Sequence, residues 1–88
     1  MNWVNSHRKN EVFASTLKCG RFNVVVHHHI DYPPAVWLTT CHGLYSHVQL
    51  KSQSLDDAKA EALAGLKQLL ETTVLELDSV LDTQAIIA

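Results

Sequence analysis

Apolar and polar residues alternate with a period of two along the middle of the chain, between residues 11 and 50. This period is typical of β-strands that bury one face. The stretch richest in β-branched and aromatic residues is Phe22 to Ile30, which makes it the clearest strand. The pattern predicts four strands in all, over residues 12–18, 22–30, 36–41 and 45–50.

Turn-forming residues separate these predicted strands. Gly20 and Gly43 each follow a strand and supply the positive φ that a tight turn requires. Between them, Pro33 and Pro34 interrupt the ladder, because proline has no backbone N–H to donate. Residues 1–10 show no clear period and are predicted to be a loose lead-in. The middle of the chain is therefore expected to be an antiparallel meander of three or four strands.

After residue 51 the period lengthens to that of a helix. Ser54 followed by Asp57 resembles a capping box, and from Leu55 onward apolar residues recur at steps of three and four. The pattern predicts one helix over residues 54–81 and a short tail over 82–88. The predicted fold class is α+β: one domain over residues 1–88, with the sheet over 11–50 and the long C-terminal helix packed on one sheet face.

The predicted helix is longer than the sheet that it covers. Residues 55–81 would extend about 40 Å, whereas strands of about six residues extend only about 20 Å. Either the helix breaks near Thr72 and Thr73, or its second half contacts another chain. We favour the second alternative, a homodimer through four apolar residues: Val74, Leu77, Val80 and Leu81.

Side-chain alternation also predicts which sheet face the helix covers. The covered face is expected to carry the aliphatic positions Val24, Val26, Val36, Leu38, Val48 and Leu50. The opposite face is then rich in aromatic and imidazole side chains, a composition typical of interface cores. It is predicted to bind a partner through His27, His29, Trp37, Tyr45 and His47. Two alternatives are that residues 1–10, with Trp3, cover this face, or that it is simply exposed.

Composition and charge exclude several classes of protein. The net charge is −2, but residues 1–51 carry five Lys and Arg against two acids, and residues 52–88 carry two against seven. Five scattered cations do not form the basic stripe of a nucleic-acid binder. The chain contains no apolar run of twenty residues, no apolar signal-peptide core and no disulfide framework in its two cysteines. A cytoplasmic location away from membranes is expected.

The candidate chemistry is sparse. Six histidines and two cysteines suggest zinc, but they form neither a C-x-x-C pair nor a helical H-x(3–5)-H pair, so no metal or other cofactor is predicted. Glu11 and Asp31 are the only carboxylates of the strand region, and the three isolated glycines do not form a phosphate loop. The sequence therefore predicts no catalytic residues and no enzymatic activity.

The run from Trp37 to Leu44, followed by Ser54-Leu55-Asp56-Asp57-Ala58 and an alanine-rich helix, resembles the HicB-type antitoxin domain. The resemblance covers about residues 21–70 and implies a small protein that binds and blocks an mRNA-cleaving toxin. His42-Gly43 stands where that family has a Pro-Gly-Cys turn. In style, though not in motif, the chain is also similar to phage anti-defence proteins of the anti-CRISPR type. These are short, compact and catalytically empty.

These observations favour a non-catalytic protein-binding module of phage or mobile-element type. It is expected to inhibit or regulate a host defence or toxin protein by occluding a functional surface. An antitoxin-like regulator is the first alternative. The second is a module resembling the double-stranded-RNA-binding domain, ranked last because Asp56 and Asp57 would repel phosphate at the helix start.

Overall fold

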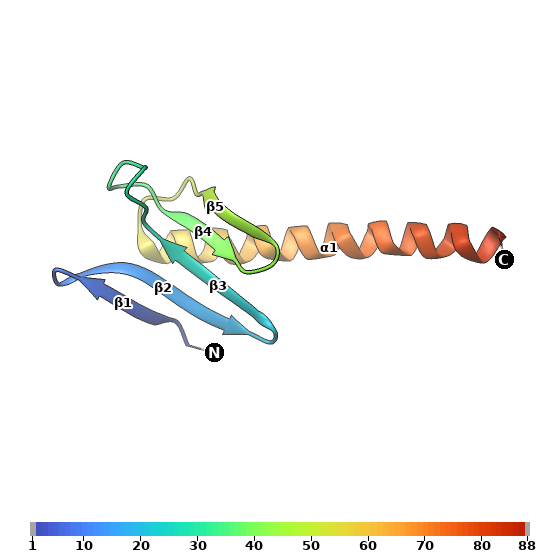
Figure 1. Cartoon of the computed structure of the whole chain (residues 1–88), viewed down its shortest axis with the longest axis horizontal. Coiled ribbons are helices and arrows are strands. Elements are labelled where there is room, and N and C mark those ends of the chain that lie inside the picture. Colours follow the sequence, from blue (N-terminus) through green and yellow to red (C-terminus); the bar gives the residue numbers. More distant parts are fainter. Residues whose placement is uncertain (1, 88) are drawn as a thin grey trace.

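The computed structural model describes residues 2–87 of the chain, and the side chains of residues 2–83. Five strands precede a single helix in this part of the chain (Figure 1). The elements are β1 (Val4–Arg8), β2 (Glu11–Cys19), β3 (Phe22–His27), β4 (Leu38–Cys41), β5 (Tyr45–Gln49) and α1 (Leu55–Ile87).

The strands form one sheet in the order β1-β2-β3-β4-β5, in which every neighbouring pair is antiparallel. The α+β class, the meander and the long C-terminal helix are thus confirmed. The loose lead-in predicted for residues 1–10 is wrong, because Val4–Arg8 pair with β2 as an edge strand. All five residues of β1 are exposed, so neither face of this strand shows the apolar alternation that sequence patterns detect.

β3 ends earlier than its composition predicts. It stops at His27 rather than Ile30, and residues 28–37 form a connection of bends and turns before β4 begins at Leu38. Ile30, the last residue of the predicted strand, is 95% exposed in this connection. Backbone hydrogen bonds from Tyr32 to His29 and from Val36 to Pro33 close its turns.

α1 is one unbroken helix of 33 residues that continues well beyond the sheet (Figure 1). Its first turn is capped as predicted, because the Ser54 hydroxyl accepts a hydrogen bond from the Asp57 N–H at 3.2 Å. Thr73 does not break it; its hydroxyl donates to the Leu69 carbonyl within the helix at 2.8 Å. The prediction of a non-helical tail from residue 82 is wrong, since α1 continues through residues 82–87. The molecule is therefore elongated, with extents of 60 × 26 × 19 Å.

The core lies between the first half of α1 and one face of the sheet. Its buried members are Val24, Val26, Trp37, Cys41, Leu50, Ala58, Ala62 and Leu66. Alanines at the contact positions let the helix backbone approach the sheet closely. Half-buried apolar residues at the margin pack against this core: Trp3, Phe22, Tyr45, Leu55, Leu63 and Leu70.

Glu61 fixes the connection between β5 and α1. Its carboxylate accepts hydrogen bonds from the backbone N–H groups of Lys51 and Ser52 at 2.9 Å each, and from the Ser52 hydroxyl at 2.7 Å. These donors lower the pKa of the Glu61 carboxyl, with the Lys51 N–H contributing most. The charge on Glu61 therefore stabilises the angle at which the chain enters the helix.

Candidate functional site

The sheet face opposite α1 is the candidate site. The register of the strands places on it alternate residues of each strand, because the residues between them pack on the helix. These residues are Val4, Ser6, Arg8, Glu11, Ala14, Thr16, Lys18, Asn23, Val25, His27, Leu38, Thr40 and Gln49. Arg8 and its strand partner Glu11 lie at one end of the face, and Lys18 lies at the other. The residues named above that lie between these ends carry no charged side chain.

Three histidines gather at one end of this face. The rings of His27 and His47 meet edge to face with centroids 5.4 Å apart, and the ring of His29 lies 4.7 Å from that of His47. Tyr32 closes the group, with its ring centroid 6.0 Å from that of His29. We call His27, His29, His47 and Tyr32 the imidazole cluster. The structure thus brings together the three histidines that the sequence predicted to bind a partner.

His27 is held in one tautomer by its two neighbours. Its Nδ1–H donates to the His28 carbonyl at 3.0 Å, which leaves Nε2 to accept from the Thr40 hydroxyl at 2.8 Å. Thr40 Oγ1 in turn accepts from the His47 N–H at 3.1 Å. Burial lowers the pKa of His27, and the nearby His47 and His29 lower it further. Both effects favour the neutral ring.

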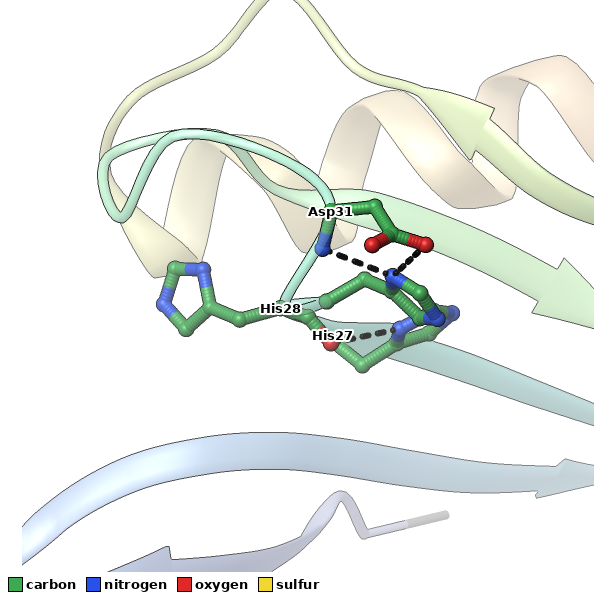
Figure 2. A network of polar contacts seen from close by, with 4 residues as sticks. His27, His28 and Asp31 are labelled. Atoms are coloured by element: carbon green, nitrogen blue, oxygen red, sulfur yellow. Dashed lines mark hydrogen bonds and ion pairs between the residues drawn. The ribbon is translucent and has the colours of Figure 1, made fainter.

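His29 contacts Asp31 in two ways. The Asp31 N–H donates to His29 Nδ1 at 3.1 Å. The Asp31 carboxylate lies 3.6 Å from the same nitrogen. Figure 2 draws both contacts as dashed lines that end on Asp31. Both the backbone and the side chain of Asp31 therefore help to position the His29 ring.

His28 belongs to the core edge and not to the cluster. Figure 2 shows its side chain directed away from that of His27. Its ring stacks on Trp37, with centroids 3.7 Å apart, and its Nδ1–H donates to the Val36 carbonyl at 2.8 Å. His28 is therefore a hydrogen-bonded residue at the edge of the core.

The placement of Trp37 and Tyr45 on the open face is wrong. Trp37 is 7% exposed in the core under α1, and its indole N–H donates to the Gln53 carbonyl at 3.0 Å. Tyr45 is half-buried on the same side. The prediction for β4 is also wrong. It placed Leu38 on the face that the helix covers, whereas Thr39 and Cys41 face the helix and Leu38 faces away from it.

A bulge in β5 explains the error at Tyr45. The register shifts between Thr39 and Cys41, where His47 adopts a φ of 53°. The extra residue changes the alternation, so that Tyr45 and Val48 both lie on the helix side of the sheet. Sequence periodicity has no means of detecting such a bulge, because His47 is neither glycine nor asparagine.

The Thr40 hydroxyl donates to the His27 imidazole, which is the contact that a nucleophile makes with its general base. Three surface cavities have volumes of about 580, 560 and 520 Å³, and neither His27 nor Thr40 lines any of them. Within residues 2–87, no group of three or more His, Cys, Asp or Glu side chains has a geometry that would hold a metal ion. The described part of α1 is also not apolar enough along its length to cross a membrane.

The residues predicted to form a dimer are exposed on the projecting half of α1. Val74, Leu77, Val80 and Leu81 are between 54% and 64% exposed, and Leu75 beside them is 69% exposed. Soluble monomers rarely leave so many large apolar side chains adjacent to one another in solvent. This half of α1 is therefore a second candidate surface.

Comparison with known proteins assigns neither surface: no family model matches the chain, and no curated protein or solved structure matches it.

Proposed function

We propose that this chain is a non-catalytic protein-binding module of phage or mobile-element type, which blocks a functional surface of a host defence or toxin protein. The observation that supports this proposal best is the sheet face opposite α1, whose middle carries no charged side chain and whose one end carries the imidazole cluster. Depletion of charge with enrichment of aromatic rings is the composition of the core of a protein–protein interface.

The stiffness of this face also favours binding. His27 and Thr40 are fixed by hydrogen bonds to each other and to the backbone of His28 and His47. Leu38, the cross-strand partner of His27, is fully buried, so it supports the face without being accessible to a partner itself. Side chains that are already ordered lose little conformational entropy when a partner covers them, so more of the contact free energy contributes to affinity.

The proposal is tested in bacteria that carry a defined CRISPR–Cas system directed against a phage. Expression of the chain is expected to restore plaque formation by the targeted phage. Val25→Glu, which places a charge in the centre of the open face, is expected to abolish this effect. Ala60→Glu on the exposed outer surface of α1 is the matched control and is expected to retain it.

Loss of plaque restoration in both variants, or in neither, would contradict the assignment of the face. Both proteins are first compared by thermal melting, so that a folding defect is not mistaken for a binding defect. If the chain does not restore plaques but does rescue growth when co-expressed with a small mRNA-cleaving toxin, the antitoxin alternative replaces the anti-defence one.

A further inference from the structure

A cavity of about 560 Å³ lies between the edge strand β5 and the flank of α1, on the helix side of the sheet. Pockets that bind small molecules have volumes of about 300–1,000 Å³. Apolar walls are formed by Leu44, Val48 and Leu50 from the sheet and by Ala62 and Leu69 from the helix. Leu44, Val48 and Leu69 are between 40% and 46% exposed, so this apolar wall is open to solvent. We call this space the β5–α1 cavity.

Small residues on α1 leave room for the cavity. Ala62, Ala64 and Gly65 line it, and their side chains extend little or not at all beyond the helix backbone. A Cβ added to Gly65 would meet no atom within 4 Å. Glycine is disfavoured inside helices, yet it stands here, where a larger side chain would occupy the cavity. Position 65 therefore controls how much of the cavity is free.

Two buried hydroxyls in the cavity wall lack partners. Thr39 and Tyr45 both line the cavity, and Thr39 is only 4% exposed. The hydroxyl oxygens of both residues are buried, and neither has a hydrogen-bond partner among the described residues. Most buried polar groups in folded proteins are paired, because an unpaired one costs stability. The two hydroxyls are therefore polar groups that a bound molecule would satisfy.

The hydroxyl pair requires an acceptor more than a donor. Burial raises the pKa of Tyr45, so its phenol stays protonated, although the nearby Thr39 hydroxyl opposes this rise. No hydrogen bond of acceptable geometry joins the two oxygens. If a small rotation joined them, one O–H would donate to the other oxygen, and the second O–H would still lack an acceptor. One acceptor supplied from outside therefore completes the pair.

The charge around the cavity disfavours an anionic ligand. Glu61 is the only charged residue among the described residues of the lining, and its carboxylate accepts from the N–H groups of Lys51 and Ser52. None of these lining residues is a lysine, an arginine or a histidine. A ligand carboxylate would therefore be repelled by Glu61 and would find no cation in the cavity wall.

We propose that the β5–α1 cavity binds a small neutral molecule that has an apolar body and one carbonyl-type oxygen. The apolar body covers Leu44, Val48 and Leu69, and the oxygen accepts a hydrogen bond from the hydroxyl pair of Thr39 and Tyr45. An apolar lining with a few convergent polar groups is the usual composition of a small-molecule site. The cavity lies on the helix side of the sheet, so this site is independent of the open face and of the function proposed above.

Acetophenone and α-methylstyrene test the proposal, because they have nearly the same shape and only acetophenone has an acceptor oxygen. Each is titrated into the purified full chain, and the methyl signals of Val48, Leu50 and Leu69 are followed by nuclear magnetic resonance. Acetophenone is expected to bind saturably and about fivefold more tightly than α-methylstyrene, which is the gain from one neutral hydrogen bond. Benzoate, a charged acceptor, is expected to bind more weakly than acetophenone.

Variants separate the cavity from its polar groups. Gly65→Leu fills the cavity and is expected to abolish saturable binding of both compounds. Ala60→Leu, on the exposed surface of α1 outside the cavity, is the matched control and is expected to retain it. The double variant T39V/Y45F removes both hydroxyls with little change of shape. It is expected to melt at or above the wild-type temperature, because both unpaired groups are removed, and to bind the two compounds equally.

Absence of saturable acetophenone binding to the wild type, or binding that G65L does not reduce, would overturn the site. Equal wild-type affinity for the two compounds, tighter binding of benzoate, or a T39V/Y45F protein that melts below the wild type would overturn the assigned ligand chemistry. G65L is expected to restore plaques as the wild type does, because the open face is unchanged. Loss of plaques in G65L but not in A60L would overturn the independence of the two sites.

Discussion

Trp37 gives the sharpest test of which side of the sheet is the core. The indole is buried beneath α1, stacks on His28 and donates to the Gln53 carbonyl. Truncation of a buried tryptophan to alanine costs about 3–5 kcal/mol, as lost transfer free energy plus a cavity. The hydrogen bond adds little, because Gln53 is exposed and water can replace the donor. We therefore expect Trp37→Ala to lower the free energy of unfolding by about 4 kcal/mol.

Urea denaturation followed by circular dichroism measures this loss at one fixed protein concentration. A small domain has a total stability of about 5–15 kcal/mol, so the variant is expected to unfold at low urea or to be partly unfolded in buffer. Ile30→Ala, a large apolar residue that is 95% exposed, is the control and should change stability by less than about 0.5 kcal/mol. A loss of less than about 1 kcal/mol in Trp37→Ala would mean that the indole is exposed, and would refute the core described above.

Three further predictions concern single side chains. Glu61→Ala should lower the free energy of unfolding by about 2–3 kcal/mol, measured by urea denaturation, because two backbone N–H groups lose a charged acceptor. Because folding lowers the pKa of the Glu61 carboxyl, its contribution to the free energy of unfolding is present above the unfolded pKa near 4.5 and is lost as the pH falls through the folded pKa. In Glu61→Ala, the free energy of unfolding should therefore depend less on pH in this acidic range. Gly65→Ala should raise the melting temperature, since an added Cβ meets no atom within 4 Å and alanine favours the helix by about 1 kcal/mol. Folding also lowers the pKa of His27, so its contribution to stability should be fully present above the unfolded pKa of 6.5 and should be lost at lower pH. His27→Gln should therefore flatten the dependence of melting temperature on pH between pH 5 and 7.5. An unchanged dependence would contradict the burial of the ring.

The sequence predicted those parts of the fold that depend on local pattern. Alternation at β2 and β3, the two glycine turns and the Ser54 cap each depend on residues adjacent in the chain, and each is present. β1 was missed because an edge strand exposed on both faces has no apolar period. The prediction stopped the helix at residue 81, although α1 continues to Ile87.

The candidate site was only partly predictable, because its composition depends on register. Three of the five residues expected on the open face do gather there, in the imidazole cluster. Trp37 does not, since the parity of β4 is set by its pairing with β3, which places Thr39 opposite Val26. Tyr45 does not, because the β5 bulge adds one residue. A one-residue shift moves a side chain to the other face of a sheet, so such errors are large in space although small in sequence.

The most direct test of the central claim is a nuclear magnetic resonance titration of the chain with the purified defence effector whose inhibition restores plaques. The imidazole Hε1 signals of His27, His29 and His47 report on the open face, and that of His28 reports on the core edge. Binding through the open face predicts that the first three signals shift or broaden, while the His28 signal and the side-chain signals of Val74, Leu77 and Leu81 on α1 stay in place. Perturbation confined to these α1 side chains, with the three cluster signals unchanged, would contradict the account.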